Sequence, residues 1–147
     1  MNDKLFYRLL YGFPHLFPEG EESQIYVPDG WSDLVYNLCQ TITQHQWERN
    51  YYPLHVTCIK EKFGHLRFYI EGSADVTIHT LIAEAENRSG EICEQSGNPG
   101  SLHEKNGWLK TLSEEKALEL GYQKVQTLET FGNMELPWIL PKVSLKC

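Results

Sequence analysis

Residues Leu54–Glu71 read LHVTCIKEKFGHLRFYIE, and this pattern predicts a β-hairpin at the centre of the fold. Val56 and Cys58 alternate with polar neighbours before Gly64, and every second residue of Leu66–Ile70 is apolar after it. Alternation of period two on both sides of a glycine is typical of two antiparallel strands that bury one face. We therefore expect helices from the rest of the chain to cover that face.

Three helices are predicted around the hairpin. The clearest is Trp31–His45, whose apolar residues recur at i, i+3, i+4, i+7 and i+11 behind Asp29 as the capping residue. A second helix is expected from its cap Asp75 to Ser89, and a short one from Asp3 to Leu10, while Gln24–Val27 is a short extended piece. These elements predict an α+β fold with N-terminal helices and a central hairpin sheet packed by helices.

The segment Ile92–Leu120, ICEQSGNPGSLHEKNGWLKTLSEEKALEL, has the pattern of a treble-clef-like zinc finger that has lost its ligands. Cys93 and Ser96 occupy the places of a Cys-x-x-Cys knuckle, and Ser113 and Lys116 those of the pair that opens a helix. A serine hydroxyl is a poor zinc ligand and a lysine ammonium has no lone pair. We expect no metal and no cofactor here, because Cys93 and His103 would supply only two ligands.

Apolar packing must hold this degenerate ββα unit together if no metal does. We expect two strands, at Leu102 and at Trp108–Leu112, and then a helix Glu114–Leu120 between a Ser113 cap and Gly121. The side chains expected to supply the packing are Leu102, Trp108, Leu109, Leu112 and Leu118.

The chain is short enough for a single domain, 1–147. Within it we expect an α+β core over 1–91, the degenerate zinc-finger-like subdomain over 92–121, and an apolar extended strap over 122–147. No apolar run approaches a membrane span and the N-terminus lacks the features of a signal peptide. Four scattered cysteines then predict reduced thiols and a cytoplasmic protein.

The chain has a net charge of −7, and its acidic residues are concentrated in two zones. Residues 9–48 contain acids and no Lys or Arg, and residues 68–104 contain acids and Arg88 alone. Such zones repel phosphate backbones and attract a basic protein partner, although an ordinary solvated surface also fits. The residues expected to bind that partner are Glu19, Glu21, Glu22, Asp29, Asp33, Glu84 and Glu91, with Trp47, Tyr51 and Tyr52 as aromatic anchors.

Catalytic signatures are absent from the sequence, which contains no phosphate-binding glycine loop, no H-E-x-x-H and no G-x-S-x-G. Sites built from His45 with His55, or His65 with His79, are an alternative without a local pattern to support it. We therefore expect a protein that is not an enzyme.

Several strings together resemble a family of uncharacterised bacterial and prophage-borne proteins. They are KFGHLRFY at 62–69, AEAENRS at 83–89, Ile92-Cys93-Glu94 with Gly97 and Pro99-Gly100, GWLKTL at 107–112, and Gly30-Trp31 with Asp33-Leu34. The resemblance covers roughly residues 13–118 and implies a C-terminal treble-clef finger and a mobile-element context. It implies no activity.

The function predicted from these features is that of a small acidic binding protein, first of all a toxin-immunity inhibitor of the antitoxin type. A phage anti-defence inhibitor is the close variant. A nucleic-acid-associated accessory protein is the second alternative, with Lys60, Lys62 and Arg67 of the hairpin and Trp108 as its contacts. The acidity of the chain disfavours direct nucleic-acid binding.

Overall fold

Helices and strands are interspersed along the whole chain, of which the computed structural model describes residues 3–20, 23–49 and 53–125. The helices are α1 (Asp3–Gly12), α2 (Ser32–Glu48), α3 (Val76–Ser89) and α4 (Glu114–Leu120), with a 3₁₀ turn η1 (Asp29–Trp31) before α2. The strands are β1 (Gln24–Ile25), β2 (Leu54–Lys62), β3 (His65–Gly72), β4 (Ser101–Lys105), β5 (Trp108–Leu112) and β6 (Gln123–Lys124).

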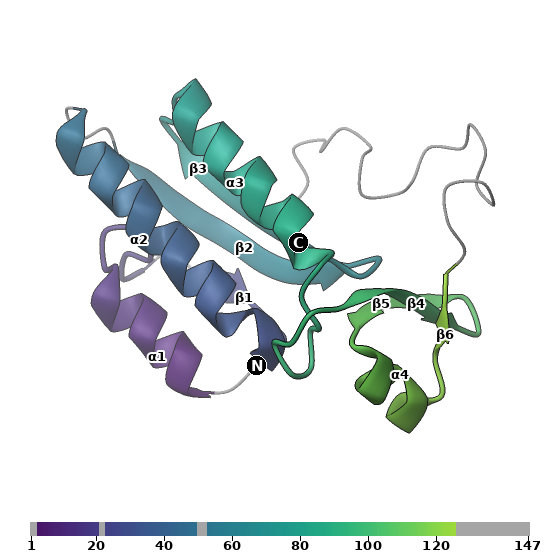
Figure 1. The fold of residues 1–147 in the computed structure, drawn as a ribbon. Coiled ribbons are helices and arrows are strands. Elements are labelled where there is room, and N and C mark those ends of the chain that lie inside the picture. The colour runs from purple at the N-terminus through teal and green to yellow at the C-terminus, as the bar shows by residue number, and fades with distance from the viewer. Residues whose placement is uncertain (1–2, 21–22, 50–52, 126–147) are drawn as a thin grey trace.

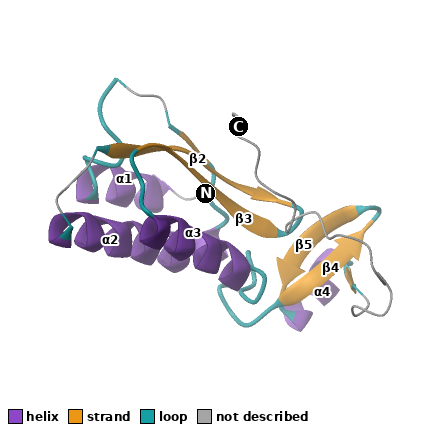
Figure 2. Ribbon diagram, turned by 90° about the horizontal axis from the view of Figure 1, so that it is seen from above, coloured by secondary structure: helices purple, strands orange, loops and turns teal. Residues whose placement is uncertain are grey.

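The first sheet has the order β1-β2-β3, with β2 and β3 antiparallel and β1 parallel to β2. Helices α1, α2 and α3 lie on one face of this sheet (Figures 1 and 2). The predicted hairpin, its Gly64 turn and the α+β class are thus confirmed. Gly64 adopts a φ of 81°, which a glycine reaches without steric cost.

A β-bulge in β2 changes which residues face the helices. Val56 pairs with Ile70 and Cys58 with Tyr69, so β2 advances by two residues while β3 advances by one. Val56 and Cys58 are both buried between polar neighbours, as predicted, but Ile59 rather than Cys58 joins Val56 in the cluster that packs under the helices. The alternation therefore does not continue past the bulge. A bulge shifts the phase of every later residue by one, which a period-two pattern does not anticipate.

The described cysteines do not all have free thiols. Cys39 and Cys93 are free, whereas Cys58 is disulfide-bonded. The expectation of reduced cysteines is therefore wrong for Cys58, because distance along the chain does not tell which thiols meet in space.

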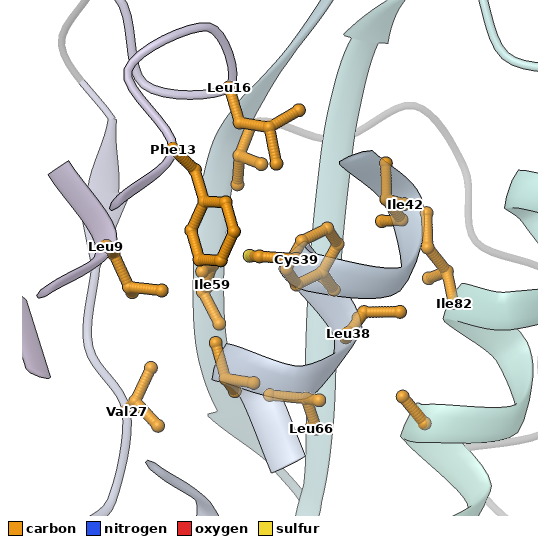
Figure 3. Close-up of a cluster of buried hydrophobic side chains, with 14 of the residues drawn as sticks. Leu9, Phe13, Leu16, Val27, Leu38, Cys39, Ile42, Ile59, Leu66 and Ile82 are labelled. Atoms are coloured by element: carbon orange, nitrogen blue, oxygen red, sulfur yellow. The ribbon is translucent and has the colours of Figure 1, made fainter. Parts of the chain in front are cut away.

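The core lies between the sheet and the helices. Figure 3 shows Leu38, Cys39 and Ile42 of α2 among side chains from the neighbouring elements, including Phe13 and Ile59. The predicted cap of α3 is confirmed, since the Asp75 carboxylate accepts the backbone N–H of Ile78 at 3.0 Å. Asp29, in contrast, does not cap α2: it begins η1, and no side-chain cap hydrogen bond is made there.

Strand β3 forms the edge of the part of this sheet that the structure describes, and α3 covers that edge. The backbone N–H of Leu66 donates to the Ser89 hydroxyl and the N–H of Phe68 to the Glu86 carboxylate, both at 2.9 Å. Glu86, counted by sequence in the second acidic zone, is therefore a buried structural group. These bonds occupy donors that an exposed edge would offer to another chain.

The C-terminal unit is a second sheet of order β5-β4-β6 with α4 beside it. Its own core is small: Cys93, Leu112 and Ala117, with Tyr122 packed against them. The Ser113 cap and the Gly121 terminus of α4 are confirmed. The ββα order is as expected, and the treble-clef assignment itself stays a prediction.

The packing expected of two large side chains in this unit is wrong. Trp108 is 74% exposed because it lies beside the Asn106-Gly107 turn, at the closed end of the hairpin and away from Leu112 of the small core. Leu118 is 84% exposed because the short helix α4 turns only Ala117 fully inward. Leu112 is buried as expected, while Leu102 and Leu109 are half-buried.

Hydrogen bonds join residues 92–121 to the α+β core. The Glu94 carbonyl accepts the backbone N–H of Gly30 at 2.8 Å, and the Ile92 carbonyl accepts the Trp31 indole N–H at 2.9 Å. The Thr111 hydroxyl donates to the Gly64 carbonyl at 2.6 Å. The second unit thus rests on η1 and on the turn of the first hairpin.

The predicted strap over 122–147 lies outside the described residues apart from its first four. Of these, Gln123–Lys124 form β6, which pairs with β4. Over the described ranges, none of the helices is long and apolar enough to cross a membrane.

Candidate functional site

A groove of about 280 Å³ runs between α2 and α3, which lie side by side (Figure 1). One wall carries Asp33, Asn37 and Thr41, spaced four residues apart on the outer side of α2. The other wall carries Glu84 and Arg88 of α3. Among the described residues, the groove is therefore lined by a carboxylate from each of the two acidic zones and by one cation, Arg88.

A second hollow of about 280 Å³ continues from the first, with which it shares Gly30, Asp33 and Gly97. Asp29 and Asp33 line it together with the cations Lys4 and Arg8 of α1. Its formal charges balance, so this hollow has no preference for a basic ligand.

A third pocket, of about 260 Å³, lies on the other side of Asp29. Of the residues that the structure describes, Asp29, Glu61 and Glu94 line it with Lys110 as the only cation, and Tyr26, Pro28 and Gln95 complete its walls. With three carboxylates to one ammonium, it is the most negative of these hollows. We call it the Glu94 pocket.

The elements around Glu94 explain why a carboxylate is buried there. Its backbone N–H donates to the Thr111 carbonyl at 2.9 Å and its carbonyl accepts from Gly30, so the residue is fixed between β5 and η1. The side chain is 2% exposed, and the Lys110 ammonium donates to its Oε1 at 2.9 Å. Strand β5 thus supplies both the anchor and the counter-ion.

The electrostatics of this pair are dominated by burial. Burial raises the pKa of Glu94, against the hydrogen bond and charge of Lys110, and the nearby Glu61 raises it further. Burial also opposes the charge of Lys110, but its bond to Glu94 and the negative charges of Glu94 and Glu61 raise the pKa of Lys110 overall. A further cation in the pocket would favour the ionised form of Glu94.

The residues predicted to bind a partner are only partly brought together. Asp29, Asp33 and Glu84 line the connected hollows. Glu19 and Glu91 are exposed but line none of the hollows described above. Glu21, Glu22, Tyr51 and Tyr52 lie outside the described residues.

The predicted anchor Trp47 is distant from the acids of the groove. It is 70% exposed and lies near the C-terminal end of α2, whereas Asp33 lies near its start. At 1.5 Å per residue these two positions are about 20 Å apart along the helix. Trp47 and Asp33 therefore fit one partner only if its contact surface is wide.

Sequence reasoning missed Glu61, Glu94 and Lys110 as members of a site. The sequence places Glu94 in an acidic zone and Lys110 in a predicted strand. The pairing of Glu94 with Lys110, however, depends on how residues 92–121 fold back on themselves.

The four degenerate finger positions do come together. Although burial opposes it, hydrogen bonds from the Ser96 hydroxyl and from the backbone of Ser113, Ser96 and Gln95 lower the pKa of Cys93. The backbone N–H of Lys116 donates to the Ser113 hydroxyl at 3.2 Å. The pKa of Lys116 is raised mainly by Glu119, and the charge of Cys93 also contributes. Ser96 and Ser113 thus lie near the Cys93 sulfur, with Lys116 close by.

The structure shows the contacts of the residues considered for a metal or catalytic site. Among the described residues, no three His, Cys, Asp or Glu side chains gather as a metal site. His45 contacts Asp75 at 2.7 Å and His55 contacts Glu71 at 3.4 Å. The absence of zinc and of catalysis stays a prediction.

Comparisons of the chain with protein-family models, with curated proteins and with solved structures gave no match. Membership of the prophage-borne family suggested by the sequence is therefore a proposal.

Proposed function

We propose that this chain is a small acidic, non-enzymatic binding protein that neutralises a basic partner protein, as a toxin-immunity inhibitor of the antitoxin type does. One observation carries the proposal: Asp33 and Glu84, about fifty residues apart and one from each acidic zone, line one groove, which the charge-balanced hollow connects to the net-negative Glu94 pocket. Carboxylates fixed on packed helices attract a basic surface and speed its encounter without needing to reorganise.

The mechanism would be occlusion of the partner's basic site. The acids of the groove and of the Glu94 pocket would face the Lys and Arg residues that the partner uses to hold its own anionic substrate. A phage anti-defence inhibitor would act in the same way on a different target, and the prophage-like sequence strings suit either role. The predicted cytoplasmic location belongs to the same proposal.

The nucleic-acid-associated alternative has a weaker basis. Its hairpin patch depends on Lys60 and Arg67, which are paired across β2 and β3, and Arg67 is only 5% exposed. Trp108 is exposed, but it lies in the second sheet. A phosphate backbone would also meet the net charge of −7.

The test is capture of the partner by the tagged full chain from its native host, at low and at high salt. Two matched double variants accompany it: Asp33→Asn with Glu84→Gln in the groove, and Glu48→Gln with Glu104→Gln at exposed acids of the same two zones. We expect one stoichiometric basic protein, lost at high salt and weakened only by the groove variant. The purified partner should lose its activity when the chain is added in equal amount.

Equal capture by both double variants, at every salt concentration, would contradict the electrostatic mechanism. A captured protein that keeps its full activity in the complex would contradict neutralisation. A gel shift with nucleic acid at low salt, in the absence of any protein partner, would favour the accessory-protein alternative.

A further inference from the structure

The Glu94 pocket lies where the two parts of the chain meet. Asp29 of η1 and Glu61 of β2 come from the α+β core, while Glu94 and Lys110 come from residues 92–121. Asp29 and Tyr26 are exposed at its rim, and Glu94 is buried. The pocket is therefore open to a ligand that reaches inward from the surface.

Glu94 presents an unused acceptor in this pocket. Lys110 occupies Oε1, whereas Oε2 is buried and has no hydrogen-bond partner. Buried carboxylate oxygens are nearly always hydrogen-bonded, because an unsatisfied one has lost its water without replacement. A ligand that brings a donor to Oε2 would restore the missing bond.

The neighbouring groups define the charge and the kind of that ligand. Glu61 already accepts the Gly64 N–H through Oε2 at 2.6 Å, which leaves its other oxygen for the pocket. Among the described residues, these carboxylates are not grouped closely enough to chelate a metal. A planar cation with several N–H donors can reach carboxylates that lie apart.

We propose that the Glu94 pocket binds a guanidinium group, with Glu94 Oε2 at its base and Asp29 and Glu61 at its sides. The assignment of that guanidinium to an arginine of the basic partner rests on the proposed function. Guanidinium is suited to the pocket because it is weakly hydrated, stays charged and donates to more than one carboxylate at once.

A small-molecule probe tests the pocket apart from the partner. Nα-acetyl-arginine amide is titrated into the isotope-labelled full chain, and the amide signals of Gly30, Glu94 and Lys110 are followed by NMR. Nα-acetyl-citrulline amide, which has the same shape and no charge, is the matched ligand. We expect saturable shifts with the arginine derivative and about tenfold weaker binding of the citrulline derivative, as for loss of a charged hydrogen bond.

Variants locate the binding. Glu94→Gln and Asp29→Asn should each weaken the arginine derivative, and Asp29 is exposed, so its replacement leaves the buried pair intact. Glu104→Gln, an exposed acid outside the pocket, should bind like the wild type. Equal shifts with both ligands, shifts elsewhere only, or displacement of the arginine derivative by Mg²⁺ at equal concentration would overturn the proposal.

The two proposals can fail separately. Arginine binding at the pocket without any basic partner in the capture experiment would leave the guanidinium site and overturn the inhibitor function. A neutralised partner whose affinity is unchanged by Glu94→Gln and Asp29→Asn would leave the function and overturn the pocket as its contact.

Discussion

At the scale of single residues, Gly30 permits the closest contact between the two parts of the chain. A Cβ placed on it would overlap the Cys93 carbonyl oxygen and lie 2.7 Å from the backbone of Glu94 and of Gly97. All three neighbours are backbone atoms, so a side-chain movement cannot relieve the overlap. No residue other than glycine fits here without moving η1 away from the knuckle.

We expect Gly30→Ala to lower the free energy of unfolding by at least about 2 kcal/mol, as overpacking does at a rigid contact. Gly12→Ala is the control, because its Cβ would meet only the Tyr36 ring at ordinary contact distance and alanine favours the helix. Urea denaturation of both variants measures the effect. Equal midpoints for Gly30→Ala and the wild type would show that the contact is loose in solution.

The residue scale is also where sequence reasoning was least able to locate the site. The acids Asp29, Asp33 and Glu84 were selected by charge alone, and they line connected hollows. The burial of Glu94 and the exposure of Trp108 were not foreseen, because each depends on a tertiary contact or on a position in a hairpin. Composition ranks residue types by burial but does not place an individual side chain.

At the scale of elements, the bonds from α3 to β3 hold a helix against a strand edge. The Ser89 hydroxyl accepts from Leu66 and donates to the Glu86 carbonyl, and it is fully buried. Removing it leaves a buried backbone N–H without its acceptor.

Ser89→Ala should therefore lower the free energy of unfolding by about 1–3 kcal/mol. It should also speed hydrogen exchange at the Leu66 amide more than at amides of β2. Thr80→Ala, at an exposed position of the same helix, is the control and should change stability little. Equal stability of the two variants would show that the Ser89 hydroxyl does not stabilise the contact of α3 with β3.

The gathering of the four degenerate finger positions leads to a second element-scale prediction. A chain with Ser96→Cys, Ser113→Cys and Lys116→His would combine Cys93 with three new ligands. We expect it to bind Co²⁺ with the absorption of tetrahedral thiolate coordination, and Zn²⁺ to raise its melting temperature. The same triple variant with Cys93→Ser should bind more weakly, and no Co²⁺ spectrum would mean that the knuckle has a different geometry.

Element types were predictable because each has a local cause. The Asp75 cap, the Ser113 cap and the Gly64 turn all depend on neighbouring residues, and all three are confirmed. The bulge at Val56–Cys58 and the Asp29 turn were missed because the rest of the fold imposes them. Local chemistry therefore predicts where helices and strands occur. It predicts less well which face of a strand a residue lies on and at which residue a helix starts.

At the scale of the whole molecule, His65 links stability to pH. Burial lowers the pKa of His65 from 6.5 to about 4, while the positive charge of Arg67 adds to the effect and a bond to the Phe63 backbone opposes it. In the unfolded chain the imidazole keeps its ordinary pKa, so between pH 6.5 and 4 the unfolded state binds more protons than the folded state.

The free energy of unfolding should therefore fall by about 3 kcal/mol through this residue as the pH drops from neutral to 4. His65→Gln cannot titrate, so its stability should depend less on pH in that window. His79→Gln, at an exposed position of α3, should keep the wild-type dependence. Urea unfolding at a series of pH values measures the difference, and parallel curves for the two variants would refute it.

The Glu94 pocket has walls from both parts of the chain. It therefore exists only in molecules in which the segment around Glu94 is hydrogen-bonded to η1, the seated state. The apparent affinity for an arginine ligand is then the intrinsic affinity multiplied by the seated fraction. A change at Thr111 or Gly64, which touch no ligand, would alter binding by releasing the knuckle. In return, a bound partner would hold residues 92–121 against the α+β core and protect them from proteases for as long as it stays bound.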